Sequence, residues 1–343
     1  MSKQSVVVTG AAGFVGRHLV DALVQADYDV VASDITPRIH RQDVRYERVD
    51  IRDLEAVTRL LEGADGVIHN ASMVHTRDTC VADVWAINHG GTAHMLRACR
   101  AQHVPRFVYV SSGSVVYQGE DIEAGDESLP YCRIPQAPYA ESKIAAEQDV
   151  LAASDDDLAS VALRPHVIFG PHDGRFLPAI LERANAGRLR YGVGRENKLS
   201  DFTYVENLVD ACLAALRRVE PGAACAGKPY FITNGEPMAF WDFVGRMLEA
   251  LDLPPIRGRV PYAVAYGAAA VAEAFKGLRG DTLGADTGLS RFAIRYMCTH
   301  HYFRIEAAER DLGWTPAVDL REGIARTAQF LKQSGAMAGR RSA

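Results

Sequence analysis

The sequence has 343 residues, of which 48% are hydrophobic, so the chain can bury a large core in one or two domains. Its formal net charge of −5 argues against a nucleic-acid-binding surface. The six cysteines lie apart without a CxxC pair, and no HExxH pattern occurs, which argues against a disulfide framework and against a metal site.

The first half of the chain alternates apolar runs with helical patterns. It starts almost directly with an apolar run and shows no signal peptide, which predicts a cytoplasmic protein. Between the runs, apolar residues recur at three- and four-residue spacing, which predicts helices. This alternation predicts an α/β fold with a Rossmann-type doubly wound parallel sheet. The predicted strands are residues 5–9, 29–33, 66–70, 106–112 and 160–164.

The glycines after the first predicted strand indicate a phosphate site. TGAAGFVG places Gly10, Gly13 and Gly16 between a strand and a helix that opens with Phe14 and Val15. Glycines let the backbone approach a pyrophosphate, whose charge then meets the helix N-terminus. Because the strand, the loop and the helix occur in the required order, we expect a dinucleotide to bind here.

Acidic residues after the next strands indicate which dinucleotide binds. Asp34 ends the second strand, where a carboxylate accepts hydrogen bonds from a ribose 2′-OH and repels a 2′-phosphate. NAD is therefore the expected cofactor, with NADP as the alternative because Arg38 lies nearby. Asp50 and Ile51 follow the third strand and are expected near the adenine ring.

The stretch PYAESKIAAE, residues 138–147, places a tyrosine four residues before a lysine at the start of a predicted helix. Tyr139 and Lys143 therefore share a helix face. They are either an ordinary surface pair or a phenol whose proton is made mobile by an ammonium. Ser112 ends the run at 106–112, and the carboxyl ends of parallel strands face the ligand crevice, so Ser112 and this helix can meet there.

Five segments together resemble the extended short-chain dehydrogenase/reductase family: TGAAGFVG, NHGGT, YVSSGSVVY, YAESK and LRPHVIFGP. The resemblance implies a catalytic triad of Ser112, Tyr139 and Lys143, assisted by Asn88, with Ser114 as an alternative to Ser112. A phenol has a pKa near 10, and a neighbouring ammonium together with the nicotinium charge would lower it. Tyr139 would then exchange a proton with a substrate hydroxyl while a hydride moves.

The expected cofactor contacts also include residues that follow later strands, together with the two catalytic residues on the helix. These residues are Asn70, Ala71, Ser72, Tyr139, Lys143, Pro165 and Val167.

The substrate is predicted from the branch of the family that the chain resembles. Nucleotide-sugar enzymes carry an asparagine where this chain has Val167, and an apolar residue cannot make that contact. The segments at 201–211, 229–237 and 300–314 instead resemble the 3β-hydroxysteroid dehydrogenase branch. This resemblance implies a hydrophobic substrate, a 3β-hydroxysteroid or a sterol 4-carboxylate. The alternatives are reduction of a 2-alkyl-3-oxoalkanoate and then a nucleotide-sugar epimerase or dehydratase. Asp34 favours the sterol reading.

The second half of the chain is irregular and is expected to form a smaller lobe. We assign residues 1–170 to a dinucleotide-binding Rossmann domain, with a segment near 203–234 returning to it. Residues 171–202 and 235–331 form the predicted substrate-binding lobe, and residues 332–343 a mobile tail.

Residues 260–272 carry no charge but are too few to span a membrane, which takes about twenty. This segment is either a buried helix of the lobe or an apolar flap with at most peripheral membrane contact. A homodimer is an expectation from the family resemblance.

Overall fold

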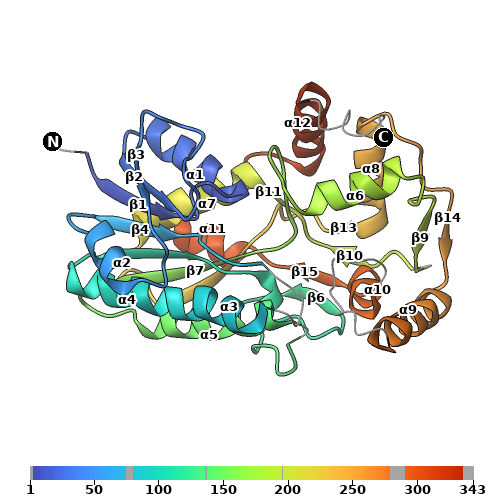
Figure 1. The fold of residues 1–343 in the computed structure, drawn as a ribbon, viewed down its shortest axis with the longest axis horizontal. Coiled ribbons are helices and arrows are strands. Elements are labelled where there is room, and N and C mark those ends of the chain that lie inside the picture. Colours follow the sequence, from blue (N-terminus) through green and yellow to red (C-terminus); the bar gives the residue numbers. More distant parts are fainter. Residues whose placement is uncertain (1–2, 75–79, 136, 195, 279–289, 335–343) are drawn as a thin grey trace.

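The computed structural model describes residues 3–74, 80–135, 137–194, 196–278 and 290–334. Its centre is a seven-stranded sheet in the order β12-β7-β5-β4-β1-β2-β3, and every pairing in it is parallel (Figure 1). The predicted α/β doubly wound sheet is therefore confirmed. Its strands are β1 (Ser5–Thr9), β2 (Asp29–Asp34), β3 (Arg45–Arg48), β4 (Gly66–His69), β5 (Arg106–Val110), β7 (Ala159–Pro165) and β12 (Lys228–Ile232).

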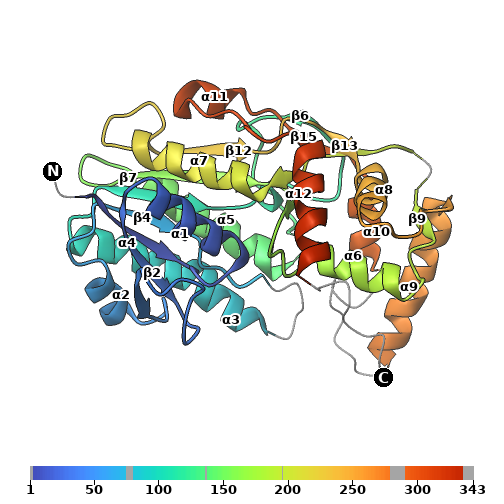
Figure 2. The same cartoon turned by 90° about the horizontal axis from the view of Figure 1, so that it is seen from above.

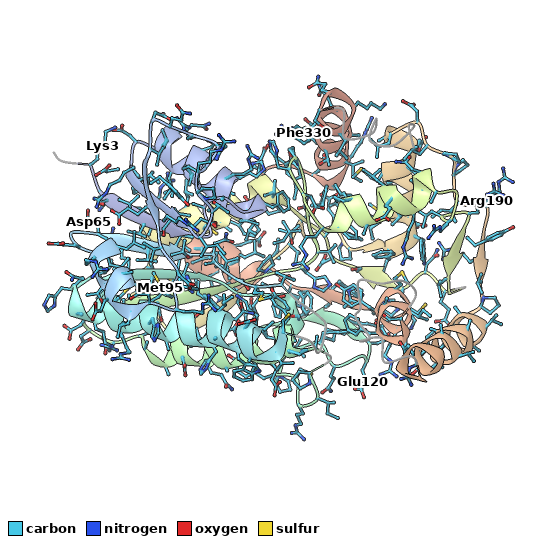
Figure 3. All side chains as sticks on the ribbon, viewed as in Figure 1. Lys3, Asp65, Met95, Glu120, Arg190 and Phe330 are labelled. Atoms are coloured by element: carbon cyan, nitrogen blue, oxygen red, sulfur yellow. The ribbon has the colours of Figure 1, made fainter. Side chains whose placement is uncertain are left out.

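Helices cover both faces of this sheet (Figure 1). One face packs against α1 (Phe14–Gln25), α7 (Val205–Arg218) and α11 (Glu306–Leu312). The other face packs against α2 (Leu54–Leu60), α4 (Thr92–Ala101) and α5 (Pro138–Ala152), and α3 (Val81–Trp85) packs on α5. Each face has its own hydrophobic core, as expected of a sheet whose strands are buried on both sides. Met95 of α4, labelled in Figure 3, is fully buried in the core on this second face.

The remaining elements form a second lobe beside the carboxyl ends of the large sheet (Figures 1 and 2). A four-stranded sheet in the order β13-β10-β15-β6 connects the lobe to the first half of the chain, because β6 precedes α5 in the sequence. Further strand pairs are β8–β11 and β9–β14. The strands are β6 (Ile122–Gly125), β8 (Ile168–Phe169), β9 (Tyr191–Val193), β10 (Leu199–Ser200), β11 (Thr203–Tyr204), β13 (Met238–Ala239), β14 (Gly258–Val260) and β15 (His301–Phe303).

Helices complete this lobe and share the core of the sheet's α1 face. They are α6 (Phe176–Asn185), α8 (Phe240–Ala250), α9 (Tyr262–Leu278), α10 (Arg291–Met297) and α12 (Leu320–Gln333). The rings of Phe202 and Phe243 stack there with centroids 3.9 Å apart. Figure 2 shows α12 crossing between the large sheet and the lobe.

Two late segments have definite places in this fold. The apolar run at 228–234 contains β12, which pairs with β7 at the edge of the large sheet. Lys332 still belongs to α12, and its ammonium lies 2.6 Å from Asp252, so the chain remains ordered past the predicted start of the tail. Residues 335–343 of the predicted tail lie outside the described residues. The proposed division into two domains stays a prediction.

The apolar segment at 260–275 lies almost entirely in α9. Ala265 and Ala269 are buried, whereas Val264 and Val271 are exposed, so one face of the helix packs on the lobe and the other faces outward. Over the described ranges, no helix is both long and apolar enough to cross a membrane.

Candidate active site

The glycine loop between β1 and α1 is closed so tightly that it excludes side chains. Gly10 has φ 68°, and the N–H of Gly13 donates to its carbonyl at 3.1 Å. A Cβ on Gly16 would lie 2.0 Å from the Gly10 oxygen. Gly13 is the N-cap of α1, and Phe14 and Val15 form the first turn of the helix. The loop therefore presents backbone N–H groups at a helix N-terminus, as pyrophosphate binding requires.

Asp34 lies beside this loop at the end of β2. Its carboxylate accepts the N–H of Ala12 at 3.0 Å and that of Thr36 at 3.2 Å, so the side chain is held against the glycine loop. Thr36 in turn donates its hydroxyl to the Arg38 carbonyl at 3.1 Å. This position fits a carboxylate that accepts hydrogen bonds from a ribose.

The two residues expected near adenine differ in their surroundings. Asp50 accepts hydrogen bonds from Arg52 on its surface turn, and this contact lowers the pKa of its carboxyl group. The Ile51 side chain is 6% exposed, and it lies so close to Gly91 that a Cβ there would meet it at 2.4 Å. Ile51 therefore contributes to the core below α4, and its contact with adenine stays a prediction.

The segment after β4 is fastened to the glycine loop by a threonine and a buried histidine. Thr9 Oγ1 accepts the N–H groups of Asn70 and Ala71 at 3.2 and 3.1 Å, and it lies 2.7 Å from His69 Nδ1. Asn70 Nδ2 donates to the Gly10 carbonyl at 3.3 Å. These bonds bring the expected cofactor contacts together at the carboxyl edge of the sheet.

Asn88 lies in a π-helical turn, Ala86–Gly91, between α3 and α4. Its Oδ1 accepts from Ser72 Oγ at 3.1 Å and from Met73 N–H at 2.7 Å, and its Nδ2 donates to Ser142 Oγ at 3.0 Å. Ser142 Oγ donates to the Tyr139 carbonyl at 2.9 Å. Asn88 therefore holds the segment after β4 against α5. Single π-turns of this kind occur at functional sites.

Tyr139 stands in the first turn of α5, and its phenol is partly buried. Burial raises the pKa of Tyr139, while hydrogen bonding to Ser112 and Ser72 and the charge of Arg175 act in the opposite direction. The expected lowering is therefore not supplied by the protein's own groups. Ser112 also accepts the N–H of Ser114 at 3.2 Å, which fixes the turn that follows β5.

Lys143 is 1% exposed on the same helix face as Tyr139. Its ammonium donates to the Val110 carbonyl at 2.6 Å and lies 4.1 Å from the centroid of the Tyr109 ring. Burial lowers the pKa of Lys143 to about 7, and the Glu147 carboxylate opposes that decrease. A lysine this deeply buried is not half of a surface pair.

Pro165 and Val167 follow at the end of β7. Val167 has φ 40°, a conformation that is unusual for a β-branched residue and that occurs at functional sites. A Cβ on Gly113 would meet His166 Nδ1 at 2.9 Å and the Pro165 carbonyl oxygen at 3.5 Å, so the turn after Ser112 lies against this segment.

Three charged residues near the site were not predicted from the sequence. Glu147 and Arg164 form a buried ion pair behind Lys143, with Arg164 Nη2 2.6 Å from Glu147 Oε1. Glu147 could have been found from the sequence, because it follows Lys143 at the same four-residue spacing at which Lys143 follows Tyr139. Arg175 precedes α6 in a loop fixed by Asp173, and the sequence carries no comparable signal for it.

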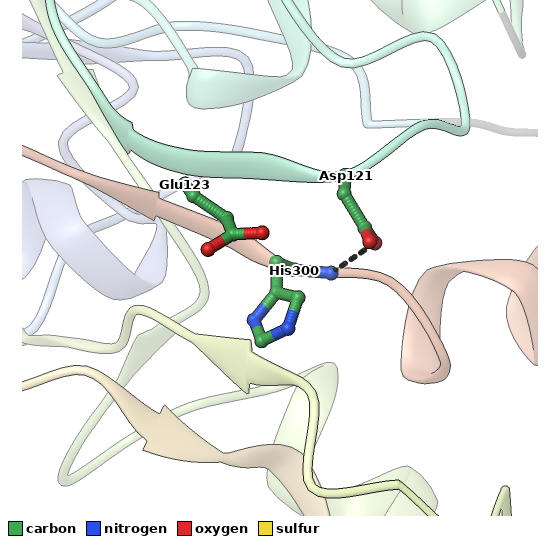
Figure 4. Close-up of side chains that lie close together, drawn as sticks. All are labelled: Asp121, Glu123 and His300. Carbon is green, nitrogen blue, oxygen red and sulfur yellow. Dashed lines mark hydrogen bonds between the residues drawn. The ribbon is translucent and has the colours of Figure 1, made fainter.

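A cluster of Asp121, Glu123 and His300 lies on the four-stranded sheet (Figure 4). The Asp121 carboxylate forms an ion pair with Lys198 at 2.8 Å and accepts a hydrogen bond from the N–H of His300, also at 2.8 Å. These contacts explain the cluster as a surface ion pair that joins β6 to the lobe.

Comparison with known proteins places the chain among oxidoreductases. Residues 7–260 match the model of the 3-beta hydroxysteroid dehydrogenase/isomerase family. A 2-alkyl-3-oxoalkanoate reductase of Stenotrophomonas maltophilia is 37% identical over 332 residues, covering 94% of this chain and 97% of that protein. A decarboxylating sterol-4-alpha-carboxylate 3-dehydrogenase of Mus musculus is 32% identical over 324 residues, covering 94% and 89%. Among solved structures, MoeE5 in complex with UDP-glucose and NAD has a TM-score of 0.74 and 25% identity, covering 96% of this chain and 99% of that chain.

Proposed function

The chain belongs to the 3-beta hydroxysteroid dehydrogenase/isomerase family, and from this we propose an NAD-dependent oxidoreductase that interconverts a hydroxyl and a ketone on a hydrophobic acid. The reacting carbon lies β to the carboxylate. The reaction type rests on one observation: Tyr139 and the fully buried Lys143 lie one turn apart on α5, and the Lys143 ammonium donates to the Val110 carbonyl at the carboxyl end of β5. Both relatives described above are named for substrates in which an oxygen lies β to a carboxylate.

The residues present fit a nicotinamide dinucleotide. The loop from Gly10 to Gly16 would hold the pyrophosphate, and Asp34 would accept hydrogen bonds from the adenosine ribose. Lys143 would hold the nicotinamide ribose. The bound cofactor supplies the hydride acceptor or donor, and its nicotinium charge favours the phenolate against burial.

In the oxidative direction, the Tyr139 oxygen takes the proton of the substrate hydroxyl as the carbon loses a hydride. Ser112 Oγ holds the substrate oxygen throughout. In the reductive direction, Tyr139 returns that proton to the oxygen. An oxidised product is a β-keto acid, which loses carbon dioxide readily, so decarboxylation needs little from the protein.

Arg175 supports an acid as the substrate. Asp173 accepts the N–H groups of Arg175, Phe176 and Leu177 at 2.8 to 3.1 Å, so the loop that presents Arg175 is fixed at the start of α6. The charge of the Arg175 guanidinium favours the ionised form of the Tyr139 phenol and so opposes the rise of its pKa. A carboxylate next to the reacting oxygen would meet this cation.

The substrate is either a sterol 4-carboxylate or a 2-alkyl-3-oxoalkanoate. Asp34 favours the NAD-using sterol enzyme that the sequence predicted. The greater identity to the Stenotrophomonas reductase favours the second candidate. Both present the same reacting group to Tyr139.

The test is turnover of 3β-hydroxysteroids, sterol 4-carboxylates and 2-alkyl-3-oxo acids, each acid paired with its methyl ester. We expect the acid to be preferred over its ester by at least about tenfold in kcat/KM, the effect of one charge-assisted hydrogen bond. Arg175→Gln should remove most of that preference, whereas Arg188→Gln, on an exposed turn, should keep it. Equal turnover of acid and ester by the wild type would contradict the acid assignment, and turnover of UDP-sugars alone would favour the epimerase alternative.

The cofactor assignment has its own test. Asp34→Ala removes the carboxylate that repels a 2′-phosphate, so the preference for NAD(H) over NADP(H) should narrow or reverse. The ratio of the two kcat/KM values measures it. A wild type that already prefers NADP(H) would contradict the placement of Asp34 at the ribose.

We also propose that the protein works in the reducing cytoplasm, since the six cysteines form no disulfide in the described part of the chain and four of them are buried.

A further inference from the structure

Glu147 is a fully buried carboxylate that the proposed reaction does not use. It stands on α5 one turn beyond Lys143, as Lys143 stands one turn beyond Tyr139. Burying a carboxylate is costly unless a counter-charge and several donors surround it. The groups that compensate the buried charge of Glu147 therefore indicate the function of this residue.

The carboxylate is bonded on both oxygens. Oε1 accepts from Arg164 Nε at 3.0 Å, from Arg164 Nη2 at 2.6 Å and from the Tyr131 hydroxyl at 2.9 Å. Oε2 accepts from Ser111 Oγ. The Arg164 guanidinium is itself held near the rings of Tyr131 and Phe231, at 5.5 and 5.3 Å from their centroids.

Two of these contacts lead to the reacting groups. Ser111 immediately precedes Ser112, and its N–H donates to the Leu163 carbonyl at 2.7 Å, so the end of β5 is bonded both to Glu147 and to β7. On the other side, the negative charge of Glu147 lies along the same helix face as the buried ammonium of Lys143.

We propose that Glu147 is a positioning residue that keeps Lys143 protonated and holds Ser112 at the end of β5, with Arg164 and Tyr131 fixing the carboxylate between them. This inference rests on the proposed function, because it assigns Glu147 a role in the reaction of Tyr139, Ser112 and Lys143.

The other groups that face Lys143 do not supply this charge. His69 on β4 is buried, which lowers its pKa to about 3, so the imidazole is neutral near pH 7. Burial raises the pKa of Tyr109 on β5 and of Tyr139 on α5, so both phenols are neutral there as well. Burial favours the amine form of Lys143, and the Glu147 carboxylate is the anion on this helix face that opposes it.

The experiment is the pH profile of kcat/KM for the full-length chain with Glu147→Gln, which keeps the volume and removes the charge. The alkaline limb of the profile, where Lys143 loses its proton, should move to lower pH by about one unit. At a fixed pH on that limb, kcat/KM should therefore fall about tenfold, the effect of a change of one pKa unit. Glu141→Gln, an exposed position on the same helix, should leave the profile unchanged. Glu147→Asp keeps the negative charge, but its side chain is one methylene shorter and loses the contact with Ser111. It should therefore lower kcat without moving the alkaline limb.

A Glu147→Gln variant that loses activity equally at every pH would overturn the proposal, because a purely structural role predicts that result. Where this variant does not fold, wild-type protein labelled with 13C at lysine Cε gives the answer by NMR, with Lys143→Arg as the assignment control. We expect the Lys143 signal to titrate together with the alkaline limb. A Lys143 that stays protonated past the limb would equally overturn the proposal. The Lys143 pKa is read by NMR without turnover, so an unchanged Lys143 pKa in a folded Glu147→Gln variant would overturn this inference whether or not the proposed reaction takes place.

Discussion

Tyr139, the proposed proton-transfer residue, lies in surroundings that oppose its ionisation. Burial raises the pKa of its phenol, and the groups that oppose this are two hydroxyls and one guanidinium. The Lys143 ammonium donates to the Val110 carbonyl at 2.6 Å, so it would act on the phenol through its charge and through the cofactor ribose. The phenol is therefore an effective acid or base only when the nicotinium charge joins these groups, which would limit proton transfer to the loaded site.

Tyr139→Phe should accordingly lower kcat by at least about 100-fold, the loss typical of a general acid/base. Cofactor affinity should stay close to the wild-type value, because the phenol oxygen bonds the substrate. Steady-state kinetics and a fluorescence titration with NADH measure the two quantities. Retention of most of the activity would show that Tyr139 is not the proton-transfer residue.

Asp201 is a second buried acid, and its effect is on stability. Burial raises the pKa of its carboxyl group to about 7, against the hydrogen bond from the Phe303 N–H at 2.7 Å. A folded-state pKa above the unfolded value means that the folded state holds the proton more tightly. The stability contributed by this proton is present in full below the usual pKa of about 4 and is lost as the pH rises through about 7.

Asp201→Asn should therefore become increasingly more stable than the wild type between about pH 4 and pH 7, and the difference should level off above that range. Its size is about 1.4 kcal/mol of unfolding free energy for each pH unit between the two pKa values. Thermal or urea unfolding across this range measures it, with the exposed Asp156→Asn as the control that should show no trend. A pH-independent difference would mean that the Asp201 carboxyl is ionised throughout.

At the scale of elements, the connection from β1 to α1 depends on the absence of side chains. A Cβ on Gly16 would lie 2.0 Å from the Gly10 oxygen, so the loop must shift if one is added. Strain of this kind costs about 1–3 kcal/mol. Gly16→Ala should thus weaken NADH binding by at least about tenfold, measured by calorimetry.

Gly245 provides the matched control in α8, since a Cβ there meets no atom within 4 Å. Gly245→Ala should leave NADH binding unchanged and stabilise the protein by about 0.5–1 kcal/mol through helix propensity. If Gly16→Ala bound NADH as tightly as the wild type, the glycine loop would not be the cofactor site.

Elements with strong periodicity were predictable from the sequence. The apolar runs gave β1, β2, β4, β5 and β7 within one or two residues, and the family and the doubly wound fold were predicted correctly. The short strands of the lobe were not predicted, because pairs such as β8 with β11 contain two residues each and show no alternation. Spacing places Glu147 on the helix face of Lys143, but it does not reveal the bond from Ser111 to Glu147 or the bond from Ser72 to Asn88, because each joins two separate segments of the chain.

At the scale of the whole molecule, the proposed hydrophobic substrate would extend beyond its reacting group toward the second lobe. Its helix α9 carries outward-facing apolar residues, with Val264 and Val271 exposed by 61% and 57%. They are seven residues apart, two turns along one face. Ala269 on the same helix is 2% exposed, so a charge there would disrupt the core and could not report on substrate binding.

Val264→Asp combined with Val271→Asp should raise the KM for the lipid substrate while leaving the Kd for NADH unchanged. The reason is that apolar contact contributes about 25 cal/mol per Å² before ordering costs, and a charge on the contact surface removes this term. The double alanine variant keeps an apolar but smaller surface, so its KM should rise less. Both exposed valines lie outside the core, so thermal unfolding should show wild-type stability in each variant. An unchanged KM in the aspartate variant would make α9 a surface helix of the lobe and place the lipid pocket elsewhere.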